Sequence, residues 1–249
     1  KYLRELAEPY RNNDYHFNEL KYQLEAYKLR LNLKNHPHLG AESLDLLGTA
    51  FSNLGDYKRE LKFKLESLVL KTRIYKYNDL NLDIAKSLDS VANAYKNNLE
   101  FDQELKFRLK ALEIRENIFN NSDHPDLAKS YLDVARAYRN QNDPQAELEY
   151  LLKSYDMYER VYEHKPCNLD LANCLDNLGS AYGANQDPDA ELEYKKEAFD
   201  IKRSLFLGDH YEIAIILNNI SNAYRNMNDH KNELKYALSS FHMFKRLYD

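Results

Sequence analysis

The segment LANCLDNLGSAY, residues 171–182, decides how the rest of the sequence is interpreted. Its apolar or small side chains are separated by one, three or four residues and stand at Leu171, Ala172, Leu175, Leu178, Gly179 and Tyr182. Such spacing traces one stripe along an α-helix. A short polar turn follows, and Asp187-Pro188 within it suits the start of a second helix, because Asp can accept from free amides and Pro fits the first helical position. The segment therefore predicts a helix, a turn and another helix.

The same arrangement recurs six times along the 249 residues. A Glu-Leu pair, followed one residue later by Phe or Tyr, begins at Glu19, Glu60, Glu104, Glu147, Glu191 and Glu233, with spacings of 41, 44, 43, 44 and 42 residues. An aromatic residue stands nine positions before each of these glutamates, at Tyr10, Phe51, Tyr95, Tyr138, Tyr182 and Tyr224. A period of this length indicates a repeat architecture. The repeat units are approximately residues 1–36, 37–80, 81–123, 124–166, 167–208 and 209–249.

Each repeat divides into two helices, and no strand pattern competes with them. The expected helices are 2–12, 15–33, 39–53, 57–75, 81–97, 101–119, 125–140, 144–163, 168–184, 188–206, 210–226 and 230–248. One helix pair cannot bury its apolar stripe alone, so successive pairs must stack against each other. We therefore expect an all-α fold, a single continuous α-solenoid of antiparallel helix pairs spanning 1–249.

The chain has the composition of a folded, soluble protein. Its 43% hydrophobic content argues against disorder, and its net charge of -5 argues against a strongly basic nucleic-acid binder. The longest apolar run, 213–217, is far too short to cross a membrane. The chain opens with charged residues and without a signal-peptide pattern, so we expect a cytoplasmic protein and a fragment of a longer chain. Exposed apolar surface at uncapped ends would favour end-to-end self-association.

The small and aromatic positions of these repeats resemble the tetratricopeptide repeat. In the first helices they are Leu44/Leu47/Gly48/Phe51, Leu88/Val91/Ala92/Tyr95, Tyr131/Val134/Ala135/Tyr138, Leu175/Leu178/Gly179/Tyr182 and Leu217/Ile220/Ser221/Tyr224. In the second helices the small residue is Ala26, Ser67, Ala111, Ser154, Ala198 or Ser240. The period resembles that of the longer repeats found in kinesin light chains. The resemblance implies a right-handed superhelix whose concave groove, lined by the first helix of each pair, binds a peptide.

One departure from that family is the glutamate that begins every Glu-Leu pair, where these repeats usually carry a small residue. The expected reason is structural: each Glu lies in the first turns of a helix, where its charge offsets the positive end of the helix dipole. The alternative is an acidic ladder that contacts a basic partner.

The sequence offers no catalytic site, metal site or cofactor motif. Cys167 and Cys174 are seven residues apart, which matches neither a redox pair nor a zinc site. Cys174 lies on an apolar stripe and is expected in the core, whereas Cys167 is expected in a turn. The three histidines that recur at helix starts, His36, His124 and His210, are expected to be turn residues too far apart to share a metal.

Two rows of polar side chains follow the first helices between the core positions. One row is Asp45, Asp89, Asp133, Asp176 and Asn218. The other is the candidate peptide-binding row of Asn93, Lys96, Asn97, Arg136, Arg139, Asn140, Asn222, Arg225 and Asn226. Asn amides both donate to and accept from a peptide backbone, and Arg or Lys beside them favours carboxylates or phosphorylated residues. The other interpretation of both rows is an ordinary solvated polar face.

The leading hypothesis is a non-catalytic module that binds an extended or helical peptide segment of another protein, with acidic or phosphorylated residues among those it accepts. A second hypothesis is a regulatory array that clamps a catalytic or effector domain of a larger protein. An RNA-reading helical repeat is the third, disfavoured by the net charge of -5. The tyrosines at repeated positions, including Tyr22, Tyr150, Tyr194 and Tyr236, are expected to pack in the core and not to stack on bases.

Overall fold

The computed structural model describes residues 16–31, 36–75, 80–120, 122–163 and 167–248. These residues form eleven α-helices, and no strand occurs among them. The helices are α2 (His16–Leu31), α3 (Pro37–Asn53), α4 (Tyr57–Ile74), α5 (Leu82–Asn97), α6 (Phe101–Phe119), α7 (Pro125–Asn140), α8 (Pro144–Tyr162), α9 (Leu169–Ala184), α10 (Pro188–Leu205), α11 (Tyr211–Asn226) and α12 (His230–Tyr248). The all-α prediction is confirmed, and α3 to α12 begin and end within two residues of the expected bounds. The helix expected at 2–12 lies outside the described residues.

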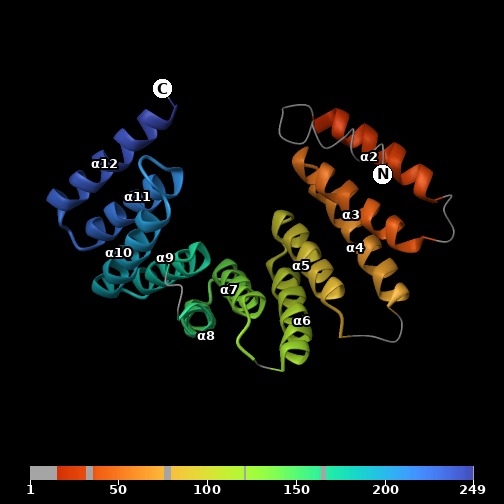
Figure 1. The fold of residues 1–249 in the computed structure, drawn as a ribbon, viewed down its shortest axis with the longest axis horizontal. Helices are drawn as coiled ribbons and strands as arrows, with labels where there is room; N and C mark the ends of the chain where they lie inside the picture. Colours follow the sequence, from red (N-terminus) through yellow and green to blue (C-terminus); the bar gives the residue numbers. More distant parts are fainter. Residues whose placement is uncertain (1–15, 32–35, 76–79, 121, 164–166, 249) are drawn as a thin grey trace. The chain divides into compact units, whose positions relative to one another are not determined.

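The chain divides into two compact units, residues 1–121 and 122–249. Within each unit, consecutive helices lie side by side as antiparallel pairs, and each pair packs on the next (Figure 1). In the first unit α4 packs on both α3 and α5, and in the second α8 and α10 are placed in the same way between their neighbours. That all six repeats form one continuous array stays a prediction.

Small residues let the two helices of a pair approach closely. Gly179 shows this most clearly, because a Cβ atom added there would lie 2.9 Å from the Glu191 carbonyl oxygen of α10. Ala92 and Ala135 occupy the same place in other repeats and are fully buried. The small position recognised in the sequence is therefore the crossing point of the pair.

The repeated aromatic residues pack against each other inside every described pair. The aromatic near the end of each first helix packs against the aromatic of the Glu-Leu-x-aromatic motif, with ring centroids 5.2–5.4 Å apart, in the pairs Phe51–Phe63, Tyr95–Phe107, Tyr138–Tyr150, Tyr182–Tyr194 and Tyr224–Tyr236. Such pairs contribute about 0.5–1.5 kcal/mol beyond their area burial. The expectation that these aromatics pack within the fold is confirmed.

The turn inside each of these five pairs has one backbone conformation. Four residues after the first-helix aromatic, the backbone enters the left-handed region at Gly55, Leu99, Asn142, Gln186 and Asn228, with φ between 59° and 74°. Around Leu99, the amides of Leu99 and Glu100 donate to the carbonyls of Lys96 and Tyr95. This pattern of bonds ends a helix in a Schellman motif. The next residue then starts the second helix; Asp56, Asp143 and Asp187 each accept from the amide three residues on.

Leu99 is the costly member of this set, because a left-handed backbone costs an ordinary L-residue about 1–2 kcal/mol and Asn less. Its side chain is also 74% exposed and so gains little from packing. We expect Leu99→Asn to raise the free energy of unfolding by about 0.5–1 kcal/mol in urea titrations. The reverse change, Asn142→Leu, should lower the free energy of unfolding by a similar amount. Equal stability of both variants and the parent chain would contradict the cost that we assign to Leu in a left-handed conformation.

Candidate functional site

The glutamate of the Glu-Leu pair is buried and ties each repeat to the next one. Five of the six, Glu19, Glu60, Glu104, Glu147 and Glu191, are only 1–5% exposed. Three of these carboxylates accept a hydrogen bond from an Asn at the end of the first helix of the following repeat. Asn53 donates to Glu19 over 3.2 Å, Asn97 to Glu60 over 2.9 Å and Asn226 to Glu191 over 2.8 Å. We call these contacts the inter-repeat Glu–Asn bonds. A buried carboxylate needs such donors, because an unpaired one is expensive to desolvate.

The structure places every one of these glutamates in the first turn of its helix, as the dipole argument required. The alternative, an acidic ladder presented to a basic partner, is wrong for the five buried glutamates, because their carboxylates are shielded from solvent. Glu233 of α12 is partly exposed and is bound by Arg225 and His230 of its own repeat. Dipole compensation alone therefore misses the main contact, which is made to the neighbouring repeat.

The fifth repeat shows what happens when the Asn is missing. Its first helix ends at Ala184, so Glu147 of the preceding repeat has no Asn to accept from at that position. Arg139 binds Glu147 instead, from the first helix of its own pair. Burial raises the pKa of the Glu147 carboxyl, and the Arg139 guanidinium opposes that shift.

Buried cations of the second helices neutralise the acidic row of the first helices. Lys64 lies 3.1 Å from the Asp45 carboxylate and donates to Thr49 over 2.9 Å. Two other repeats have the same arrangement of an acid and a polar side chain around one cation, namely Arg108 with Asp89 and Asn93, and Lys195 with Asp176 and Ser180. We call these three groups the cation triads. The aspartates of the triads therefore form ion pairs within the fold.

The fourth repeat replaces its triad by apolar contacts. Asp133 stands five residues before Tyr138, whereas the acids of the triads stand six before their aromatic, so Leu132 fills the equivalent place. The equivalent of Lys64 is Leu151, and both leucines belong to one hydrophobic cluster. Asp133 lies 3.5 Å from Arg136 instead. The site can thus be built from an ion pair or from two leucines.

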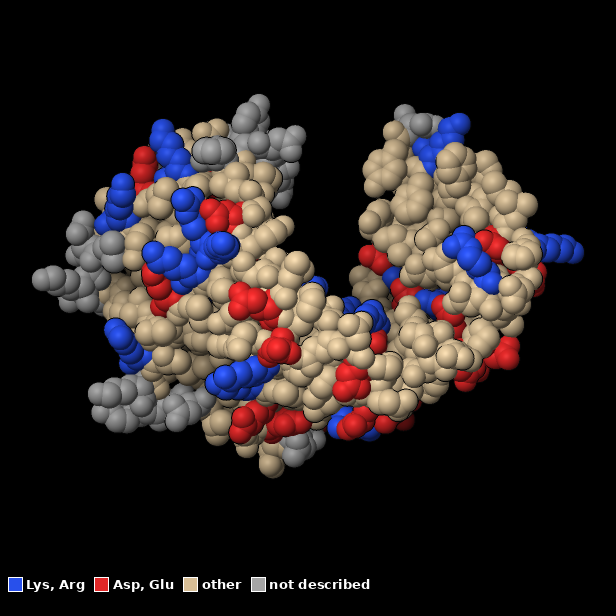
Figure 2. Space-filling model, turned by 180° about the vertical axis from the view of Figure 1, so that it is seen from behind, with Lys and Arg blue, Asp and Glu red and all other residues tan. Residues whose placement is uncertain are grey.

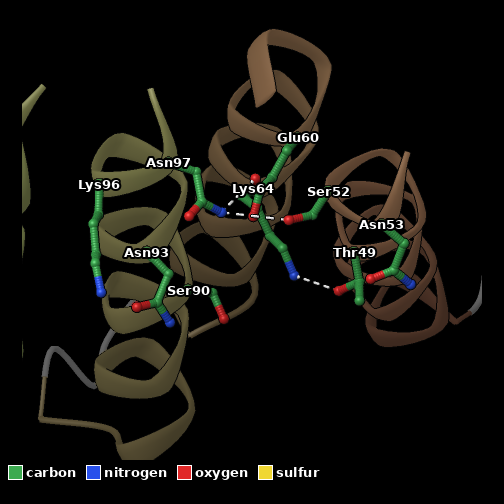
Figure 3. Close-up of a pocket in the computed structure, with 9 residues that line it drawn as sticks. All are labelled: Thr49, Ser52, Asn53, Glu60, Lys64, Ser90, Asn93, Lys96 and Asn97. Carbon is green, nitrogen blue, oxygen red and sulfur yellow. Dashed lines mark hydrogen bonds between the residues drawn. The ribbon is translucent and has the colours of Figure 1, made fainter. Parts of the chain in front are cut away.

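A polar hollow of about 310 Å³ opens beside the Lys64 triad in the first unit. Its lining comes from α3 (Thr49, Ser52, Asn53), α4 (Glu60, Lys64) and α5 (Ser90, Asn93, Lys96, Asn97). Figure 3 shows the α3 and α5 side chains facing each other across α4, whose Glu60 and Lys64 reach between them. Asn97 crosses the hollow with bonds to Glu60 and, over 3.4 Å, to Ser52.

The three candidate residues of the first unit all line this hollow, but they differ in what they already contact. The Asn97 amide nitrogen donates to Glu60 in the inter-repeat bond, and the Asn93 amide oxygen accepts from Arg108. Within the described residues, neither the Asn93 amide nitrogen nor the exposed Lys96 ammonium has a hydrogen bond or an ion pair. Lys96 is therefore the charge of this hollow that is available to a ligand.

The candidate residues of the second unit are mostly engaged with their own fold. Arg139 binds Glu147 and lies 3.4 Å from the Asn177 oxygen, Arg225 binds Glu233 over 2.6 Å, and Asn226 binds Glu191. Arg136 faces Asp133, Asn140 has a partner within the chain, and Asn222 is half-buried. Peptide binding by this row stays a prediction.

The hydroxyl side chains of the hollow, Thr49, Ser52 and Ser90, were not predicted from the sequence. Thr49 stands two residues before Phe51, and Asn93 holds the same place before Tyr95. Aligning repeats two to six on that position shows a polar residue in each one: Thr49, Asn93, Arg136, Ser180 and Asn222. The sequence therefore contains a polar residue two positions before the aromatic in these repeats, but only the Asn and Arg residues were included among the candidates.

The cysteines and histidines lie where the sequence placed them. Cys174 is buried, and burial raises the pKa of its thiol to about 11, whereas Cys167 is exposed. His124 and His210 cap helices by accepting from the amides of Asp126 and Glu212. Across the described part of the chain, no cluster of three or more His, Cys, Asp or Glu side chains is suited to a metal ion.

Charges of both signs intermix on the surface. On the face shown in Figure 2, Lys and Arg side chains lie among Asp and Glu side chains. Such mixing gives little of the clustered positive field that binding to phosphate backbones requires. Among the described helices, none combines the length and the hydropathy needed to span a bilayer.

Comparison with known proteins places the fold in a family. Residues 83–160 and residues 171–212 each match a model of the tetratricopeptide repeat. These two segments are tetratricopeptide repeats, as their small and aromatic positions predicted. Repeats of this family are in general non-enzymatic scaffolds for protein–protein interaction, and the match supports that class of function. No curated protein matches the sequence.

Solved structures share the fold at low sequence identity. BtubC (BKLC) from P. vanneervenii superposes with a TM-score of 0.79 at 14% identity, covering 94% of this chain and 93% of that one. A putative kinesin light chain from Podosopora anserina, with nearly identical TPR-like repeats, gives a TM-score of 0.71 at 15% identity over 86% of this chain and 99% of that one. A signal transduction ATPase with a tetratricopeptide repeat sensor, from Pyrococcus horikoshii, gives a TM-score of 0.71 at 15% identity. The match covers 95% of this chain and 34% of that one. These likenesses confirm the helical-repeat fold.

The cation triads predict how the polar rows contribute to stability. Asp45→Leu should lower the free energy of unfolding by about 2 kcal/mol, because it leaves the buried Lys64 without its carboxylate. Adding Lys64→Leu should restore most of the loss, since the Leu132–Leu151 contact shows that two leucines fit this place. Urea unfolding of the two variants and the parent chain measures both steps. A double variant that is less stable than Asp45→Leu alone would contradict this interpretation.

Proposed function

We propose that the protein is a non-catalytic module that binds an extended peptide segment of a partner protein in the polar hollow of the first unit. The observation that supports the proposal most strongly is the lining itself. The hollow has hydroxyl and amide groups on both walls, suited to the donors and acceptors of a peptide backbone. The tetratricopeptide match supports protein interaction as the general role.

The charges around the hollow favour a peptide with a carboxylate or a phosphorylated residue. Lys64 is already paired with Asp45, and Glu60 is buried and bonded to Asn97. Lys96 is exposed on the wall formed by α5. A ligand therefore meets one available positive charge together with the Asn93 amide nitrogen and the Ser90 hydroxyl, all of which can donate to an oxyanion. The corresponding residues of the second unit, Arg136, Arg139, Asn140, Asn222, Arg225 and Asn226, are proposed to contact the same class of peptide.

Peptides selected on the purified chain from a random display library test this proposal. We expect the selected peptides to be enriched in Asp and Glu. The variant Lys96→Glu should weaken their binding at least about tenfold in fluorescence anisotropy, because a carboxylate would then face a carboxylate. Lys86→Glu is the matched control, since Lys86 is an exposed lysine of the same helix that does not line the hollow.

Three results would argue against the hollow as the binding site. The selected peptides could lack acidic residues, Lys96→Glu could bind them as tightly as the parent chain does, or Lys86→Glu could weaken their binding as much as Lys96→Glu does. Asn97 is unsuited to this test, because its substitution would also break the inter-repeat bond to Glu60.

A further inference from the structure

Leu99 differs in residue type from its counterparts in the other described turns. At the turns inside the other four helix pairs, the left-handed residue is Gly55, Asn142, Gln186 or Asn228, which has either no side chain or a polar one. Leu99 has a φ of 63°, and its large apolar side chain is 74% exposed. It therefore destabilises the backbone without a compensating contact in the core. Such departures from local rules are expected at functional sites.

A second apolar side chain lies beside Leu99. Tyr57, the first residue of α4, is 41% exposed, and together with Leu99 it lines a hollow of about 580 Å³. The Asn98 amide nitrogen ties the two together, because it donates to the Tyr57 carbonyl oxygen over 2.9 Å and to the Ala94 carbonyl oxygen over 3.0 Å. We call this space the turn hollow. Its apolar residues are held by backbone contacts, so they need little rearrangement to receive a ligand.

The turn hollow borders the polar hollow of the first unit. Lys96 and Asn97 line both of them. The amide of Leu99 donates to the Lys96 carbonyl oxygen over 2.9 Å, so the turn holds the apolar residue close to the available positive charge. A peptide oxyanion that binds Lys96 would therefore place neighbouring side chains of the same peptide at Tyr57 and Leu99.

The other repeats lack this apolar combination. Counted from the aromatic of each first helix, the residues equivalent to Tyr57 and Leu99 are His16 with Gly55, Phe101 with Asn142, Pro144 with Gln186, and Pro188 with Asn228. Each of these sets has Gly or a side-chain amide where Leu99 stands. The fold of the repeat therefore does not require Leu at this turn, and the apolar contact is particular to the second and third repeats.

We infer that the turn hollow binds a large apolar side chain of the peptide that occupies the polar hollow, and that Leu99 and Tyr57 are its specificity-determining residues. The inference rests on the proposed function, because Lys96 would hold the acidic or phosphorylated residue of that peptide at the border of the two hollows. Charge complementarity at Lys96 sets the position of the peptide, and the apolar walls select the adjacent residue.

A positional-scanning peptide library tests this inference on the intact chain. Each peptide has a fixed central Glu, and one flanking position at a time is held as Leu, Phe, Ser or Lys while the others are random. With the parent chain, Leu or Phe should raise the amount of bound peptide at least about fivefold over Ser at one flanking position or more. The same library with a central Gln measures the contribution of the charge.

Variants of the chain locate the apolar preference. Leu99→Asn should abolish the preference for Leu and Phe but keep the preference for Glu over Gln, because Lys96 is unchanged. Leu99→Met should keep both preferences, since Met is apolar and similar in size. Leu207→Asn is the matched control, because Leu207 is 96% exposed and lines neither hollow, and it should also keep both. Urea unfolding should show Leu99→Asn to be at least as stable as the parent chain, so that a lost preference cannot come from unfolding.

Several outcomes would overturn the inference. The parent chain could bind Ser peptides as well as Leu peptides at every position, or Leu99→Asn could keep the apolar preference. Lower stability of Leu99→Asn would show that Leu99 packs against the chain itself, and a dimer of the parent chain that Leu99→Asn dissociates in sedimentation would assign the turn hollow to a second copy.

The two libraries also separate this inference from the proposed function. An apolar preference that depends on Leu99, together with equal binding of the Glu and Gln libraries, would support the turn hollow and contradict the acidic ligand of the proposed function. A preference for Glu without any apolar preference would support the proposed function and contradict the turn hollow. Absence of binding by both libraries would contradict both.

Discussion

A buried carboxylate in five of the six second helices is the constraint on which the stacking of these repeats depends. Glu60 is almost completely removed from solvent, and a charge in that position is stable only if donors surround it. Its own repeat does not supply the amide that binds it; Asn97 of the next repeat does. The surface where a repeat meets its neighbour therefore contains a buried polar contact beside its apolar cluster, and the bond fixes one register for the two repeats. Glu19–Asn53 and Glu191–Asn226 repeat the arrangement.

Around this bond, the same positions are built from different chemistry in different repeats. Three repeats neutralise an acid with a buried cation, and the fourth uses Leu132 and Leu151. The first helix of the fifth repeat ends with Ala184 in place of an Asn, and Arg139 binds Glu147 instead. In the second to fifth repeats, the acid and the cation of a triad are either both present or both replaced by leucine. In the function we propose, binding is left to the polar groups that the fold does not use, of which Lys96 is the clearest example.

The sequence predicts the helices well because their ends are set by local chemistry. In repeats two to six, the paired aromatics and the left-handed turn residue lie within 12 residues of each other, and four of these repeats also have an Asp cap there. This local pattern predicts the helix pairs directly. The small residues at the helix crossings were recognisable for the same reason. The partner of Glu60 was not predictable in this way, because Asn97 lies 37 residues further along the chain. Spacing predicts on which face of a helix a polar side chain lies. Whether that side chain contacts a ligand or a neighbouring repeat depends on how the helix pairs stack.

The most direct measurement is a double-mutant cycle on Glu60 and Asn97 in the intact chain, with Glu60→Met, Asn97→Ala and both changes together. Urea unfolding gives the free energy of each variant. The account predicts that the two single losses are not additive, with a coupling of about 1–3 kcal/mol, as expected for a buried hydrogen bond to a charged group. Losses that add to within about 0.5 kcal/mol would show that the bond does not hold the two repeats together.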